Sequence, residues 1–160
     1  FMVANTKTPA VGPGYAHFFR SGLRFTRPGF RPKVRETVKH SRLTAIAAEV
    51  VAATQRKLPP EIRPLAKAVP VHFEAAPHPS VLAEGFEPDI LGLFTGSPHG
   101  TELAHDQPAP PEILLYVENL WDFAEDDVEV FREETRLTYL HELGHYLGWD
   151  EDELAARGLD

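Results

Sequence analysis

The chain contains no cysteine among its 160 residues and only one methionine, Met2. Without cysteine, neither a disulfide framework nor a thiolate zinc site can form, and a reducing compartment is the setting that this composition favours. No run approaches the roughly 18 consecutive apolar residues that a membrane span needs, and no charged and apolar leader is visible. We therefore expect a cytoplasmic protein with no contact to a membrane.

Basic residues are scarce after position 40. Residues 1–40 hold eight Lys and Arg against one acid, and residues 41–160 hold eight against 23 acids, so the two parts carry +7 and −15 in a chain of net charge −8. We predict a basic N-terminal arm, residues 1–40, rich in Pro, Gly and aromatics, followed by one compact domain, residues 41–160. The arm is expected to dock on its own acidic domain, and nucleic-acid binding is the less favoured alternative.

Hydrophobic spacing indicates where the first elements lie. Ser41 begins a predicted helix whose apolar residues recur at i, i+3, i+4 and i+7, and the step Pro59-Pro60 ends it. Apolar and polar alternation, or a short apolar run between turn residues, then predicts three extended segments, at residues 68–75, 90–95 and 113–117.

A long helix is predicted over residues 127–147. Asp126, with Glu129 three residues later, resembles a capping box at its start. Gly148 fits the position at which a left-handed residue turns the chain back. Apolar residues surround much of the helix, so we expect it to be buried in the middle of the domain.

The segment from His141 to Glu151 reads H-E-x-x-H-x-x-G-x-x-E. On a helix, residues four apart are separated by about 40° around the axis and about 6 Å along it, so His141 and His145 present two imidazoles to one metal ion. Glu142 is turned by about 100° from the first histidine, which keeps it outside the ligand shell but close to a water molecule at the metal. This pattern is typical of zinc hydrolases in which Glu is the general base.

Two histidines leave a tetrahedral zinc ion short of a protein ligand. Because fifteen residues follow His145, we expect the third ligand in the turn after Gly148 or upstream of the motif. Glu151, ten residues after the first histidine, is the predicted ligand, and Asp150 and Asp152 are the alternatives.

Asp150 also has a plain structural use. With Glu153 it forms a D-x-x-E pair that can cap a short terminal helix over residues 153–157. This second use favours Glu151 as the ligand.

The four other histidines of the predicted domain, residues 41–160, are interpreted as surface or loop residues, namely His72, His78, His99 and His105. His99 or His105 is the alternative candidate for a contact with substrate.

Several segments together match one family: a Leu-Pro-Pro step at residues 58–60, LGLFTG at 91–96, ILLYVENL at 113–120 and, most specifically, RLTYLHELGHYLGWDEDEL at 136–154. Through them, residues 41–160 resemble the minimal zincins, a bacterial family of small zincin-like metallopeptidase domains. The resemblance implies a compact α+β fold, in which a short mixed sheet packs on an early helix and on a buried C-terminal active-site helix. No methionine follows the motif, so the Met-turn of metzincins is absent.

The resemblance also implies a site and a substrate. Zn²⁺ would be bound by His141, His145 and Glu151, with Glu142 as the catalytic base. An extended peptide or protein substrate would pair with the edge strand of the sheet beside the cleft. The arm is not covered by the resemblance.

Three functional hypotheses follow. The first is a zinc-dependent metallopeptidase in which Glu142 activates a water molecule at the metal. The second is a metal-dependent ribonuclease, which the basic arm fits and which Glu142 and the acidic domain fit poorly. The third is a metal-stabilised binding module without turnover.

Overall fold

The computed structural model describes residues 40–100 and 110–156, without the side chains of Glu151 and Leu154. Its elements are, in chain order, α1 (His40–Lys57), α2 (Arg63–Ala68), β1 (Val71–Glu74), α3 (Pro79–Ala83), β2 (Gly92–Thr95), β3 (Glu112–Tyr116), α4 (Val117–Phe123), α5 (Val128–Tyr146) and α6 (Glu151–Ala156). The predicted arm lies outside the described residues apart from His40, so its boundary and its docking stay predictions.

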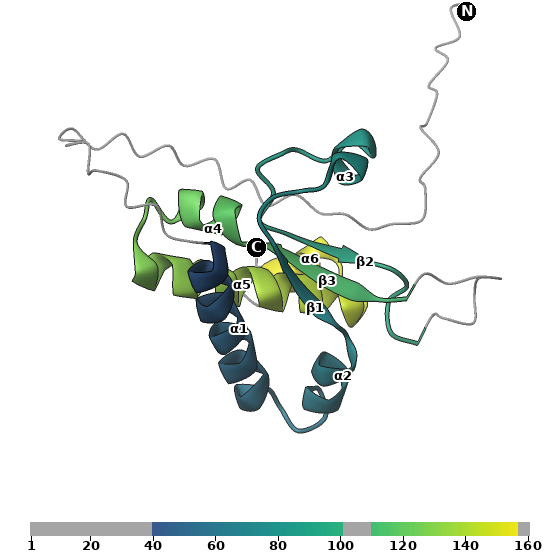
Figure 1. Cartoon of the computed structure of the whole chain (residues 1–160). Coiled ribbons are helices and arrows are strands. Elements are labelled where there is room, and N and C mark those ends of the chain that lie inside the picture. The colour runs from purple at the N-terminus through teal and green to yellow at the C-terminus, as the bar shows by residue number, and fades with distance from the viewer. Residues whose placement is uncertain (1–39, 101–109, 157–160) are drawn as a thin grey trace, which may run out of the picture.

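The three strands form one mixed sheet in the order β1-β3-β2 (Figure 1). The central strand, β3, is parallel to β1 and antiparallel to β2. Parallel neighbours need a crossover connection, and here the chain passes through α3 and β2 between the two strands. The predicted α+β fold with a short mixed sheet is therefore confirmed.

The helix α5 runs across one face of this sheet and lies behind it in Figure 1. Before the motif, Phe131, Thr135 and Tyr139 follow one another at four-residue spacing and are fully buried, which defines a single buried stripe. In its last turns, every residue from 141 to 146 is buried. The predicted burial is confirmed for these last turns, which hold the motif, whereas the helix before the motif is buried along one stripe only.

The main core fills the space between the sheet and the helices α1, α4 and α5. It is built from apolar side chains of all these elements, including Leu43, Ala47, Val51, Phe94, Ile113, Leu115, Val117, Leu120, Phe131, Tyr139 and Leu143. Burial of a Leu, Ile, Val or Phe side chain contributes roughly 1.5–3 kcal/mol. This core therefore fixes α5 firmly against the sheet.

The α5 helix begins one residue later than predicted. Its N-cap is Asp127, not Asp126: the Asp127 carboxylate accepts hydrogen bonds from the N–H groups of Glu129, at 2.9 Å, and Val130, at 3.1 Å. Asp126 has a φ of 65° and Glu125 a φ of 51°. An N-cap needs an extended backbone, so a left-handed Asp126 cannot serve, and the two left-handed residues instead turn the chain between α4 and α5.

Other predicted boundaries shift by a few residues. The predicted strand at 68–75 is shorter, because residues 63–68 form α2, and the strand predicted at 113–117 ends where α4 begins. Pro64 and Pro79 stand in the first turns of α2 and α3, where a missing N–H is tolerated. The helices α2, α3 and α4 have five to seven residues each, too few for a periodic apolar pattern to reveal them.

A smaller apolar cluster covers the opposite face of the sheet. Ile90, Leu93 and Tyr116 are buried there, with Val81 and Phe86 packed against them. Among the described residues, the hydroxyl of Tyr116 has no hydrogen-bond partner. Burial, together with the negative charges of nearby glutamates, raises the pKa of Tyr116 to about 12.

Replacing Tyr116 by Phe is expected to reduce the loss of stability at high pH. A raised folded-state pKa means that the folded protein holds the phenolic proton more tightly than the unfolded chain does. The stabilisation is thus complete below about pH 10 and is lost as the pH rises toward 12. Between pH 9 and pH 11, the free energy of unfolding of the wild type should fall by about 1 kcal/mol more than that of Tyr116→Phe. Urea unfolding at both pH values measures this difference, and an equal fall in the two proteins would contradict it.

Candidate metal centre

His141 and His145 face each other on α5, one turn apart. Both are buried, with exposed fractions of 3% and 4%. Their Nε2 atoms are 3.0 Å apart, and the ring planes meet at 81°. Two ligands at 2.0–2.1 Å from a tetrahedral zinc ion are about 3.3 Å apart. The pair therefore already has nearly the separation that a shared zinc ion requires, and neutral imidazoles are ligands that zinc prefers.

The burial of the motif is unusual for its chemistry. Among the described residues, six polar or charged side chains are buried, and three of them are His141, Glu142 and His145. Polar groups lose hydration when they are buried, which costs free energy unless a partner or a ligand compensates. The donor set of two imidazoles and one carboxylate fits a metal ion.

Glu142 lies on a different side of α5, against β2. Its exposed fraction is 3%. A Cβ atom built on Gly92 would lie 3.1 Å from both Cγ and Oε1 of Glu142, so the Glu142 side chain rests on the backbone of this strand. The position of the carboxylate is thus set by contact between a helix and a strand rather than by a loop.

A tight turn follows α5. Gly148 has a φ of 82°. Its N–H bonds to the carbonyl of His145 and the N–H of Trp149 bonds to the carbonyl of Gly144, both at 3.0 Å. These two bonds define a Schellman motif, which confirms the predicted role of Gly148. The turn directs the chain back toward the end of α5.

Two of the acids after this turn, Asp150 and Glu153, form the predicted cap. The N–H of Glu153 donates to the Asp150 carboxylate at 2.9 Å, and the N–H of Asp150 donates to the Glu153 carboxylate at 3.2 Å. The predicted cap is confirmed, although the helix it precedes, α6, begins at Glu151 rather than at residue 153. The Glu151 side chain lies outside the described part of the chain, so its role as third ligand stays a prediction. The described side chains alone include no group of three or more metal ligands.

The other histidines have their own surroundings. His72 lies 3.4 Å from Glu112, and the ring of His78 caps α3 by accepting from the N–H of Ser80. His99 is an exposed residue on the segment after β2, and its backbone N–H bonds to the carbonyl of Tyr146 at 2.7 Å, next to the predicted ligand His145. His105 lies outside the described residues.

A groove of about 440 Å³ lies between α1 and α5, on the side of α5 away from the motif. Its lining includes Lys57, Arg132 and Arg136 as well as Glu49 and Glu133. These charges partly neutralise one another, because Arg132 lies 3.1 Å from Glu49 and Arg136 lies 2.6 Å from Glu133. None of the motif residues lines this groove, so it is not the site of the proposed chemistry.

The sequence pattern does not identify Gly92 as the residue that contacts Glu142. The available signal is a glycine inside the apolar run from Ile90 to Thr95, which is typical of a close backbone approach. The partner in such an approach depends on tertiary packing, and the sequence does not reveal it.

Comparison with known protein families gives a match. A family described as zincin-like metallopeptidase matches residues 66–159, more than half of the chain. The matched region includes all three strands and the whole of α5, and it begins after α1. No curated protein matches the chain. In the parts of the chain that the structure describes, no helix is both long and apolar enough to span a membrane.

Replacing His141 by Ala should abolish stoichiometric zinc binding. Loss of a group that only supports a ligand costs about 10–100-fold in metal affinity, so loss of a ligand should cost more than about 100-fold. Zinc titration against a chelating dye measures this affinity. His72→Ala, an exposed histidine on β1, is the matched control and should bind zinc like the wild type. Equal affinities in both variants would exclude His141 as a ligand.

Replacing Glu151 by Ala should also lower the zinc affinity, whereas Asp152→Ala should not. Asp150→Ala removes the cap of α6 and should instead cost about 1 kcal/mol of stability. The same titration separates Glu151→Ala from the other two variants, and urea unfolding measures the stability lost in Asp150→Ala. An affinity that falls in Asp152→Ala and not in Glu151→Ala would assign the third ligand to Asp152.

Proposed function

Since the chain belongs to the family of zincin-like metallopeptidases, we propose that it is a zinc-dependent peptidase with Glu142 as its general base. The observation that supports this most strongly is the pair of buried imidazoles, whose Nε2 atoms are 3.0 Å apart. The buried Glu142 carboxylate on the adjacent side of the same helix turn adds the proton acceptor that hydrolysis needs.

The roles divide among a few side chains. The zinc ion would be held by His141, His145 and Glu151. When bound, it would act as a Lewis acid that polarises water and the scissile carbonyl. Two neutral imidazoles and one carboxylate leave a net charge of +1 at such a centre. Glu142 accepts a proton from the attacking water at a carboxylate oxygen and then delivers it to the leaving nitrogen as the C–N bond breaks.

The edge strand β2 offers a place for an extended substrate. The N–H of Tyr116 bonds to the carbonyl of Leu91 at 3.0 Å. Residues along an antiparallel strand alternate between bonding to the partner strand and facing away from it. It follows that Gly92 and Phe94 direct their N–H and C=O groups away from β3, toward the edge of the sheet that no other described strand covers. A peptide paired with these groups would lie beside Glu142.

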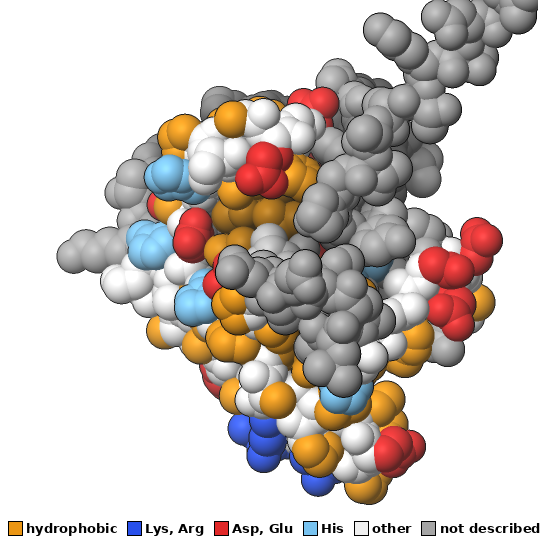
Figure 2. Space-filling model, turned by 90° about the vertical axis from the view of Figure 1, so that its right-hand side faces the viewer, with side chains coloured by type: hydrophobic (Ala, Val, Ile, Leu, Met, Phe, Trp, Pro, Cys, Tyr) orange, Lys and Arg blue, Asp and Glu red, His pale blue; other side chains and the backbone are white. Residues whose placement is uncertain are grey.

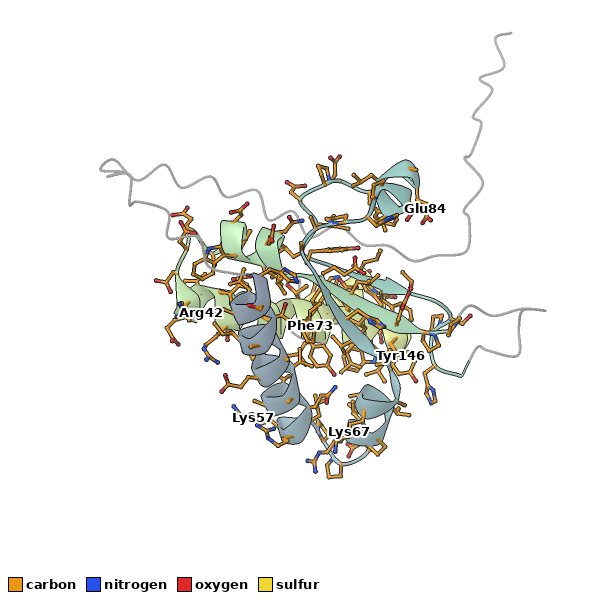
Figure 3. All side chains as sticks on the ribbon, in the orientation of Figure 1. Arg42, Lys57, Lys67, Phe73, Glu84 and Tyr146 are labelled. Atoms are coloured by element: carbon orange, nitrogen blue, oxygen red, sulfur yellow. The ribbon has the colours of Figure 1, made fainter. Side chains whose placement is uncertain are left out.

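We propose a peptide or protein substrate rather than a nucleic acid. Residues 41–160 have a net charge of −15. On the face shown in Figure 2, the described Lys and Arg side chains gather at the bottom of the view, while Asp, Glu and His side chains occur at several other places. The labelled cations Arg42, Lys57 and Lys67 point outward from α1 and α2 (Figure 3). A phosphate backbone would require a continuous basic surface.

Glu142→Gln should abolish peptide cleavage and leave zinc bound. The amide has the shape of the carboxylate but cannot accept the proton, and general base catalysis contributes about 10²–10⁴-fold. We expect kcat to fall at least about 100-fold on a quenched-fluorescent peptide library, with unchanged zinc content.

Glu84→Gln, an exposed glutamate at the end of α3 (Figure 3), is the matched control and should keep full activity. Full activity of Glu142→Gln would contradict the proposed mechanism. A zinc-loaded wild type that cleaves no peptide would instead favour a metal-stabilised binding module.

A further inference from the structure

We propose that Gly92 is a positioning residue for Glu142. Because Gly92 has no side chain, β2 can lie directly against the Glu142 carboxylate and fix its place in the site. The inference rests on the proposed role of Glu142 as the base. According to this inference, the contact with Gly92 of the edge strand aligns the base with the metal centre.

The spacing between strand and helix leaves no room for a methyl group. A Cβ atom on Gly92 would lie 2.6 Å from Cγ2 of Thr138 and 3.1 Å from Cγ and Oε1 of Glu142. Carbon atoms in favourable contact are about 3.5–4.0 Å apart. Both neighbours belong to α5 and are four residues apart, so the strand backbone packs against one face of the helix over a full turn.

Backbone conformation does not require a glycine at this position. Gly85, Gly96, Gly100 and Gly148 have φ values between 82° and 99°, whereas Gly92 is not in the left-handed region. Inside a strand, glycine lowers stability, because it has no side chain to pack and loses more entropy on folding. Space is therefore the physical reason for a glycine here.

A methyl group at position 92 would have to displace something near the base. Thr138 is β-branched, so few side-chain orientations are open to it on a helix. Glu142 is 3% exposed, and the backbone of Gly92 forms one wall of its surroundings. Gly92→Ala therefore moves β2 away from α5 or moves the carboxylate. A shift of about 1 Å in a catalytic group can cost about 100-fold in rate.

The kinetic test compares Gly92→Ala with Leu93→Val in the full zinc-loaded chain. Leu93 is the next residue of β2, but it is buried in the cluster on the opposite face of the sheet. On the quenched-fluorescent peptide library, Gly92→Ala should lower kcat about 10–100-fold, with KM and zinc affinity unchanged. Leu93→Val should weaken β2 and keep kcat. Equal kcat in Gly92→Ala and the wild type, or an equal loss in both variants, would overturn the inference.

A second measurement tests the contact of Gly92 with Thr138 and Glu142 directly and needs no substrate. We measure how much Gly92→Ala lowers the urea midpoint of unfolding in three backgrounds. These are the wild type, Thr138→Ser, which lacks Cγ2, and Glu142→Ala, which lacks Cγ and Oε1. The drop should be smaller in both variant backgrounds, because each removes an atom that the new methyl group meets. Equal drops in all three backgrounds would overturn the inference, whether or not the wild type cleaves a peptide.

The two proposals fail in different ways. Full activity of Glu142→Gln would refute the role of Glu142 as the base, and the urea midpoints would then test the contact at Gly92 by themselves. An inactive Glu142→Gln together with a fully active Gly92→Ala would refute the positioning role alone.

Discussion

The burial of α5 between the sheet and α1 is the constraint on which the rest of the structure depends. Apolar contacts along Phe131, Tyr139 and Leu143 fix the helix in the core, while His141, Glu142 and His145 occupy the same buried turns. The elements that stabilise the domain are thus the elements that place the proposed ligands. A site on a packed helix is held more precisely than one on a loop. Burial of these polar groups also means that zinc, by binding only the folded chain, should stabilise it.

The approach of β2 to α5 links this core to the chemistry. One side of the strand rests on Thr138 and Glu142, and the backbone groups of Gly92 and Phe94 that face away from β3 form the outer edge of the sheet that the structure describes. The backbone of β2 would then position both a substrate held at that edge and the proposed base. The distance between substrate and base would depend on strand-to-helix packing, which is stiff because protein interiors are close-packed.

Local patterns predicted much of this arrangement. The spacing of His141 and His145, the left-handed Gly148 and the reciprocal cap of Asp150 and Glu153 all depend on residues within about one or two helical turns, and the structure confirms their geometry. The prediction of Asp126 as the N-cap was wrong. Asp126 and Asp127 are both residues that can cap a helix, and the sequence does not show that the backbone at Asp126 is left-handed, which excludes it. The contact at Gly92 joins elements distant in sequence, so no local pattern predicts it.

The central claim is that His141 and His145 bind one zinc ion at this turn of α5. Anomalous diffraction at the zinc absorption edge, from crystals of the zinc-loaded full chain, tests it most directly. The account predicts one strong peak within about 2.0–2.1 Å of both Nε2 atoms, with a carboxylate of the following turn as a further ligand. The absence of a peak between the two imidazoles, or a stronger peak elsewhere in the domain, would contradict it.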